Sequence, residues 1–358
     1  HLPPSIIPKF RMLSHLRRRA PLLAAALLLA AGCDTGRGPT ELPEPEQWIG
    51  PAARVYVDSA LNLMQSYSLH RNEVDWPNFR AGVLRRVNGT QLPAQTHTAI
   101  HEALQSLDPH SFLIRPGAAL EDELAQVGTV FGGKLLAGRF GYVRTAPVNG
   151  PALGHAQQYH DLIRDMDGAA TCGWVVDLRF NGGGNMWPML AGVGPILGEG
   201  SPGRFVDADG VQTPWFYEGG VAGMVYNGQK VDISAAGTPY QLRRQAPPVA
   251  VLTGPGTASA AEAVAIAFRG RPATRSFGTG TAGFPTANSG YDMPDGAIVV
   301  LTTAWEEDRN GVRYATRITP DEPTAGVPSL SMDPFDDVTL GTALHWLGTQ
   351  PACQPSAG

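Results

Sequence analysis

The chain has 358 residues, a formal net charge of −5 at pH 7 and a hydrophobic content of 43%. It is long enough for one large domain or two smaller ones with a substantial core. The acidic balance and the lack of long basic runs argue against nucleic acid as a partner. The 43 glycines and 31 prolines predict many turns.

Residues 1–33 have the pattern of a bacterial signal peptide. Arg17-Arg18-Arg19 precedes an apolar run over residues 21–31, which is too short for a comfortable membrane span. The run leads into Ala-Ala-Gly-Cys, which resembles a lipobox, so Cys33 is expected to carry a lipid as the first mature residue. These features predict an extracytoplasmic protein of the cell envelope, anchored to the membrane by its lipid. The polar, proline-rich residues 34–47 are expected to form a flexible tether.

Residues 48–107 are expected to form a helical N-terminal domain. Apolar residues recur there at helical spacing in three groups: Leu61, Met64 and Tyr67; Trp76, Phe79, Val83 and Val87; Ile100, Ala103, Leu104 and Leu107. His97 and His101 stand four residues apart, but no glutamate follows His97 as in a zinc protease, so we expect solvent-facing histidines. His70, in a polar turn, is expected to be structural.

Residues 108–350 have the organisation of an α/β domain, followed by a tail over 351–358. One predicted strand, 173–178, ends in Asn181-Gly182-Gly183-Gly184-Asn185 and leads into a helix over 186–197. A second apolar strand, 249–253, turns into a helix at Ser259. In a parallel sheet such turns gather at the carboxyl ends of the strands, where ligands bind. Further β segments are expected near 287–292 and 297–303, and a helix near 154–166.

Ser259 is a candidate nucleophile because it stands at a helix N-terminus. Unpaired backbone N–H groups and the helix dipole stabilise developing negative charge there. Ser-x-x-Glu before an apolar helix is also a capping box, in which Ser259 bonds the Glu262 N–H and Glu262 reaches back. The neighbouring motifs favour the nucleophile, with Glu262 supporting the turn.

His110 is the candidate base, because a histidine with the ordinary pKa near 6.5 accepts a serine proton near neutral pH. It lies in Asp108-Pro109-His110-Ser111. Asp108 and Ser111 are candidates to support it, although Asp108 could equally cap the turn before Pro109. A decline in rate below roughly pH 6.5 is expected.

Four motifs together resemble the tail-specific, or C-terminal processing, serine peptidases. They are Asp-Pro-His-Ser from residue 108, Val-Val-Asp-Leu-Arg-Phe-Asn-Gly-Gly-Gly from 175, Thr-Ala-Ser-Ala-Ala-Glu from 257 and Pro-Asp-Gly-Ala-Ile-Val-Val-Leu-Thr from 294. The resemblance covers residues 105–325 in the family's order. It implies a crotonase-like α/β peptidase core after the helical bundle, without a PDZ insertion and without a metal or cofactor.

The resemblance also implies roles for individual residues. Many members use a lysine base in a Gly-x-Thr-x-Gly-Lys box, but the stretch from Gly278 ends in Phe284 here, so His110 fits the base of the histidine-using branch. By family position, the N–H groups of Ala260 and Gly183 form the oxyanion hole. Asp177 and Arg179, within the second motif, are expected to be structural.

Two features leave alternatives open. Residues 200–246 form a Gly-rich insertion with Trp215-Phe216-Tyr217, which is either a small β-rich cap over the active site or a β-hairpin region whose aromatics fill a local core. Cys172 and Cys353 either pair outside the cytoplasm or remain buried thiols.

The expected function is an endopeptidase that cleaves extended peptides or unfolded protein tails through a Ser–His dyad and an acyl-enzyme. In the branch that the motifs resemble most, one substrate is a lantibiotic, so a lantibiotic-like antimicrobial peptide is a candidate. The alternatives are a catalytically silent peptide-binding lipoprotein and an esterase or amidase.

Overall fold

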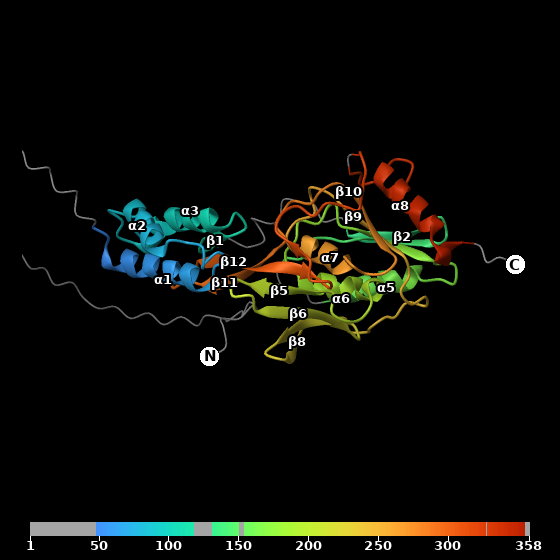
Figure 1. Cartoon of the computed structure of the whole chain (residues 1–358), viewed down its shortest axis with the longest axis horizontal. Coiled ribbons are helices and arrows are strands. Elements are labelled where there is room, and N and C mark those ends of the chain that lie inside the picture. Colours follow the sequence, from blue (N-terminus) through green and yellow to red (C-terminus); the bar gives the residue numbers. More distant parts are fainter. Residues whose placement is uncertain (1–47, 118–130, 150–153, 327, 355–358) are drawn as a thin grey trace, which may run out of the picture.

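The computed structural model describes residues 48–117, 131–149, 154–326 and 328–354. Helices gather at one end of an elongated molecule and a mixed α/β body forms the other (Figure 1). The α/β class expected from the sequence, with an N-terminal helical bundle, is confirmed. The predicted signal peptide, Cys33 and the tether lie outside the described residues. Within the described ranges no helix is long and apolar enough to cross a bilayer.

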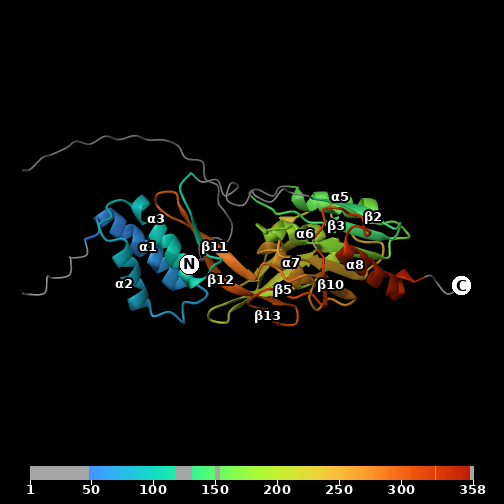
Figure 2. The same cartoon turned by 90° about the horizontal axis from the view of Figure 1, so that it is seen from above.

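The N-terminal helices share their core with a long β-hairpin. They are α1 (Pro51–Tyr67), α2 (Trp76–Arg86), the 3₁₀ helix η1 (Pro93–Thr96) and α3 (His97–Leu107). Prolines occupy the first turns of α1 and α2, where their missing N–H costs nothing. Apolar residues of the helices, such as Leu61 and Ile100, pack with Val299 and Leu301 of the hairpin. The hairpin extends from the body to the helices in both views (Figures 1 and 2).

A mainly parallel sheet lies at the centre of the body. Its order is β14-β10-β9-β4-β3-β2, and only the β2–β3 pair is antiparallel. The carboxyl ends of β4 and β9 therefore lie at the same edge, as the two strand–turn–helix units require. The strands are β2 (Gly132–Leu136), β3 (Phe140–Arg144), β4 (Gly173–Asp177), β9 (Val249–Thr253), β10 (Thr274–Gly278) and β14 (Glu322–Pro323).

An antiparallel sheet forms the second layer and has the order β1-β12-β5-β6-β7-β8, with β11 and β13 also paired to β12. The long β12 joins the hairpin near the helices to the body. The strands are β1 (Phe112–Ile114), β5 (Gly203–Asp207), β6 (Gln212–Glu218), β7 (Val221–Tyr226), β8 (Gln229–Ala235), β11 (Thr286–Asp292), β12 (Ile298–Asp308) and β13 (Arg313–Tyr314).

The segment 200–246 contains β5 to β8 of this antiparallel sheet. Trp215 and Tyr217 are buried in the largest apolar core, and Phe216 is also buried. The aromatic residues thus fill a local core, as expected for the β-hairpin alternative. Its role as a cap over the active site stays a prediction.

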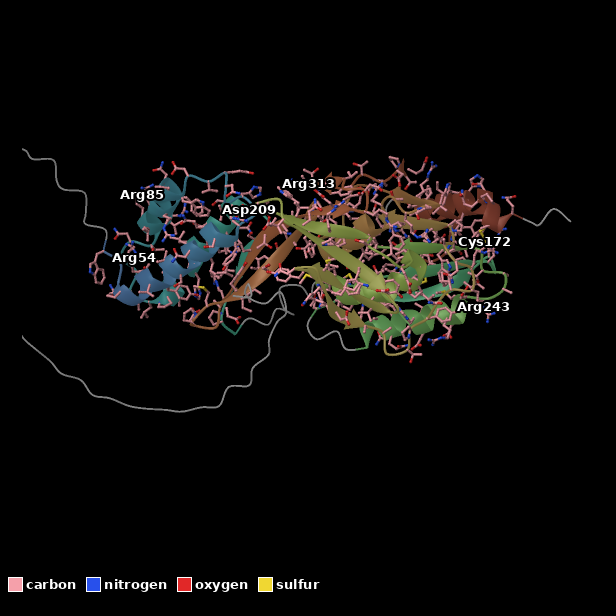
Figure 3. The ribbon with its side chains drawn as sticks, turned by 60° about the horizontal axis from the view of Figure 1, so that its bottom comes forward. Arg54, Arg85, Cys172, Asp209, Arg243 and Arg313 are labelled. Carbon is pink, nitrogen blue, oxygen red and sulfur yellow. A yellow bond between two sulfur atoms is a disulfide. The ribbon has the colours of Figure 1, made fainter. Side chains whose placement is uncertain are left out.

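Helices cover both faces of the parallel sheet. The largest core contains residues of α5 (His155–Met166), α6 (Met186–Leu197) and α7 (Ala260–Phe268) together with both sheets, whereas α8 (Val338–Thr349) packs on the opposite face of the parallel sheet. Cys172 and Cys353 form a disulfide that ties the start of β4 to the 3₁₀ helix η2 (Pro351–Cys353) after α8 (Figure 3). Of the two alternatives for these cysteines, the structure shows the paired one.

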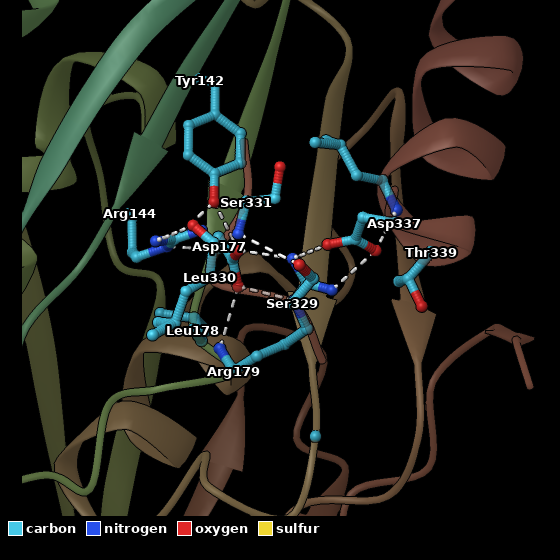
Figure 4. A network of polar contacts seen from close by, with 12 residues as sticks. Tyr142, Arg144, Asp177, Leu178, Arg179, Ser329, Leu330, Ser331, Asp337 and Thr339 are labelled. Atoms are coloured by element: carbon cyan, nitrogen blue, oxygen red, sulfur yellow. Dashed lines mark hydrogen bonds and ion pairs between the residues drawn. The ribbon is translucent and has the colours of Figure 1, made fainter. Parts of the chain in front are cut away.

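A buried ion network fixes the carboxyl end of β4 (Figure 4). Arg179 Nη2 lies 2.7 Å from Asp177 Oδ2 and 2.7 Å from Asp337 Oδ2, and Asp337 caps α8 by accepting the Leu340 N–H. Tyr142 donates to Asp177 Oδ2 at 2.6 Å. Each charge in this network has an opposite partner, which a buried charge requires. Asp177 and Arg179 therefore act structurally and hold the strand that leads to the glycine run.

Candidate active site

Ser259 occupies a strained turn between β9 and α7. Its backbone has φ 52° and ψ −120°, a conformation that non-glycine residues rarely adopt. Its N–H donates to Glu262 Oε2 at 2.9 Å, which is the Glu262 half of the capping box. The Ser259 hydroxyl lies 3.1 Å from His110 Nε2. The turn thus presents the half-buried hydroxyl to a histidine at the N-terminus of α7.

Glu262 joins this turn to the loop before β11. Its two carboxylate oxygens accept the Ser259 N–H, the Thr281 hydroxyl at 2.5 Å, the Gly283 N–H at 2.9 Å and the Phe284 N–H at 2.8 Å. Burial raises the pKa of Glu262, while these four donors oppose that shift. One side chain therefore sets the position of Ser259 relative to the 281–284 loop.

His110 is held from β11. Its Nδ1 lies 2.8 Å from Thr286 Oγ1, and its carbonyl oxygen accepts a hydrogen bond from Asn288 Nδ2 at 2.9 Å. The Phe284 ring packs against the imidazole, with 5.1 Å between the ring centroids. These contacts direct Nε2 toward Ser259.

Burial lowers the pKa of His110 to about 4, and the nearby Asp108 charge opposes this shift. The imidazole is therefore neutral at pH 7 and able to accept a proton. We therefore expect the decline in rate near pH 4 and not below pH 6.5, because desolvation disfavours the imidazolium.

The glycine run approaches the nucleophile closely. A Cβ at Gly183, which has φ 104°, would lie 2.9 Å from Ser259 Cβ. The Gly183 N–H, expected as an oxyanion donor, instead donates to Asn181 Oδ1 at 3.0 Å. Gly184 lies opposite Val148 in a parallel β-bridge. The hydrogen bonds of this bridge are made by the Gly183 carbonyl oxygen and the Asn185 N–H, so the N–H of Gly184 points away from Val148.

Asp108 and Ser111 hold the His110 segment without contacting the imidazole. Asp108 Oδ1 accepts the His110 backbone N–H at 2.8 Å, which is the turn-capping role weighed for this aspartate. Ser111 Oγ accepts the Thr302 N–H at 2.9 Å and donates to Thr302 Oγ1 at 3.0 Å. Both residues fix the backbone to β12.

The expectation for His97 is wrong, whereas His101 is exposed as expected. His97 is buried, and its Nε2 lies 2.8 Å from Asp295 Oδ2 in the hairpin turn, with Tyr56 donating to Asp295 Oδ1 at 2.8 Å. It shares a helix face with Ile100, which gives the physical reason for its burial. In the part of the chain that the structure covers, no group of three or more His, Cys, Asp or Glu side chains could hold a metal ion.

Comparisons with known proteins identify the family of this chain. The model of peptidase family S41 matches residues 139–324. The chain belongs to peptidase family S41. It is a serine peptidase, and the resemblance to tail-specific peptidases is confirmed.

Similar proteins cover most of the chain. The nisin-resistance protein of Lactococcus lactis subsp. lactis is 23% identical over 304 residues, which span 80% of this chain and 87% of that protein. A lipoprotein from Streptococcus agalactiae has a similar fold, with a TM-score of 0.65 and 22% identity over 83% of this chain and 96% of that one. The photosystem II D1 C-terminal processing protease gives a TM-score of 0.56 and 17% identity over 84% and 98% of the two chains.

Three contacts of His110 were not predicted from the sequence. Thr286 and Asn288 are supplied by β11, and Phe284 by the loop before it. The only sequence signal was Phe284 at the place of the expected lysine. Thr286 and Asn288 lie 176 and 178 residues after His110 in the chain, so no local sequence pattern links them to it.

Proposed function

We propose that this S41 peptidase is an extracytoplasmic, lipid-anchored endopeptidase that cleaves extended peptides or protein tails through a Ser259–His110 dyad. The observation that carries the proposal is the 3.1 Å contact between Ser259 Oγ and His110 Nε2 at the N-terminus of α7. Both groups are half-buried and therefore accessible to a substrate.

The dyad performs acyl transfer in two stages. His110 Nε2 takes the proton as Ser259 Oγ bonds to the substrate carbonyl carbon, and it returns that proton to the leaving amine when the C–N bond breaks. Water then attacks the acyl-enzyme, with His110 again taking a proton and returning it to Ser259. In this proposal the Nδ1–H of His110 donates to Thr286 Oγ1, which leaves Nε2 as the base.

The oxyanion is stabilised by backbone N–H groups. Ala260, the first residue of α7, has an N–H without an intrahelical acceptor, as every first helical residue does. Gly184 supplies the second donor in our proposal, because the Gly183 N–H is engaged by Asn181. Gly183 serves by leaving space against Ser259.

Three features support the cell-envelope location. The leader and Cys33 have the lipobox pattern. The Cys172–Cys353 disulfide is of the kind that persists outside the cytoplasm. A protein of similar fold is a lipoprotein. Expression with the leader should place the chain in the membrane fraction, and mass spectrometry should find a lipid on Cys33 that Cys33→Ser removes. An unmodified Cys33 in a soluble mature chain would contradict the anchor.

The substrate is proposed to be an extended peptide that pairs with a sheet edge near Ser259, because such pairing selects unfolded segments. Similarity to the nisin-resistance protein makes a lantibiotic-like peptide one candidate. Profiling with unstructured peptides, simple esters and compact domains tests this proposal. Preference for simple esters over every peptide would favour an esterase instead.

Substitutions test the dyad directly. Ser259→Ala should abolish hydrolysis with the fold retained, and His110→Ala should lower the rate by roughly two to four orders of magnitude. Lys134→Ala and Lys230→Ala are the matched controls, since both lysines are exposed, and each should leave the rate unchanged. Near-normal turnover by Ser259→Ala would refute the mechanism.

A further inference from the structure

The loop between α1 and α2 binds the helical domain to two parts of the body. The Leu69 N–H donates to the carbonyl oxygen of Thr302 in β12 at 2.9 Å. Arg71 Nη2 lies 2.6 Å from Asp209 Oδ2, and Asn72 Nδ2 donates to Asp209 Oδ1 at 3.0 Å. Asp209 lies in the turn between β5 and β6, beside the helical domain (Figure 3). One loop therefore holds β12 and the β5–β6 turn together.

His70 in the same loop reaches the segment of the base. Its Nε2 lies 3.4 Å from Asp108 Oδ2, and its ring stands edge-on to Trp305 of β12, with centroids 5.5 Å apart. The other oxygen of Asp108 accepts the His110 N–H at 2.8 Å. The Asp108 carboxylate thus lies within 3.4 Å of a side chain of the helical domain and accepts a hydrogen bond from the backbone of His110.

The place of His110 in the chain makes this contact consequential. His110 lies between α3, the last helix of the bundle, and β1, which pairs with β12. The base therefore belongs to the connection between helices and sheet, whereas Ser259 belongs to the body. Their separation depends on how the helical domain docks.

We propose that His70 is a positioning residue for His110, acting through Asp108, so that docking of the helical domain aligns the base with Ser259. The inference rests on the proposed dyad. The charged groups that contact His70 are Asp108 and, 3.2 Å from its Nδ1, Glu73 on the exposed side. Of these two, only Asp108 also bonds the base.

The test measures the rate at which a small fluorophosphonate labels Ser259, together with kcat and KM for an unstructured peptide. His70→Ala should lower both the labelling rate and kcat about tenfold with little change in KM, since alignment and not peptide binding is disturbed. His70→Gln, whose side-chain amide can donate to Asp108, should restore most of the rate. His345→Ala, at an exposed histidine of α8, is the matched control.

A double variant decides whether His70 acts through Asp108. Asp108→Asn keeps the side-chain shape and remains available if His70→Ala folds poorly. Asp108→Asn should lower the labelling rate and kcat to a similar extent. A double variant that also carries His70→Gln or His70→Ala should be little slower than Asp108→Asn alone. Labelling of His70→Ala at the wild-type rate, or losses that multiply in the double variant, would overturn the inference. Failure of the probe to label Ser259 in the unmodified protein would instead overturn the proposed function.

Discussion

Glu262→Gln should loosen the nucleophile turn at a predictable place. The amide has one acceptor oxygen, whereas the carboxylate accepts two hydrogen bonds on each oxygen. If the amide oxygen replaces Oε2, it keeps the N–H groups of Ser259 and Phe284, and the amide nitrogen then faces Thr281 and Gly283. The Thr281 hydroxyl can rotate, but the Gly283 N–H loses its acceptor. In the opposite orientation the N–H groups of both Ser259 and Phe284 lose their acceptor, so that orientation is less favourable.

A buried N–H without an acceptor costs about 1–3 kcal/mol. A change of that size lowers the melting temperature by roughly 1–4 °C in a chain of 358 residues, because the unfolding entropy is about 2.1 cal/mol/K per residue. Because the same carboxylate places Phe284 beside His110, labelling of Ser259 by a fluorophosphonate should also slow, by roughly tenfold or more.

Thermal unfolding and the labelling rate are measured on the same samples, with Glu102→Gln, at an exposed glutamate of α3, as the control. The buried charge of Glu262 carries its own desolvation cost, which raises its pKa. If that cost outweighed the four bonds, the variant would be more stable. Equal or greater stability with an unchanged labelling rate would refute the role given to Glu262.

Three further predictions concern titration and the disulfide. The peptidase rate should fall only as the pH approaches about 4, the lowered pKa of His110, and a midpoint near 6.5 in kcat/KM would contradict this. Burial and the charge of Glu262 raise the pKa of Glu306 well above its usual range, so wild-type stability should fall as pH rises above about 4.5, with a slope of about 1.4 kcal/mol per pH unit. Glu306→Gln should therefore be more stable than wild type at pH 7 but not at pH 4 in denaturant titrations. Reduction of Cys172–Cys353, which closes a loop of 181 residues, should lower the free energy of unfolding by roughly 5 kcal/mol, while Ser259 labelling at 25 °C persists. An unchanged midpoint in thermal or denaturant unfolding would contradict the pairing.

Local patterns predicted those parts of the site that depend on one strand and the turn after it. The strands before Asn181 and Ser259 are mostly apolar, and the parallel pairing of β4 with β9 brings both turns to one edge. The prediction of a solvent-facing His97 was wrong although positions 97, 100 and 104 follow helical spacing, because nothing in the sequence indicates its partner Asp295.

The contacts around His110 could not be predicted because they depend on strand register. Thr286 and Asn288 reach His110 because β11 pairs with β12 across a register shift between Ala287 and Asn288, and because β12 pairs with β1 beside His110. A shift of one residue would turn both side chains to the other face of the sheet. Hydrophobic alternation along β11 is weak, with Asn288, Ser289 and Gly290 at its centre, so the sequence carries little information on that register.

The identity of the base and the position of the helical domain are linked by electrostatics. A lysine base must be held neutral by burial, yet a carboxylate such as Glu262, which bonds the loop that ends in Phe284, would favour its charged form. A histidine becomes neutral more readily, because burial lowers the pKa of His110 to about 4 despite the opposing charge of Asp108. The proposed base, His110, lies in the connection between α3 and β1. With the proposed base in this connection, we expect catalysis to depend on the docked helices. We also expect His110→Lys to be inactive at neutral pH, because the lysine would stay charged.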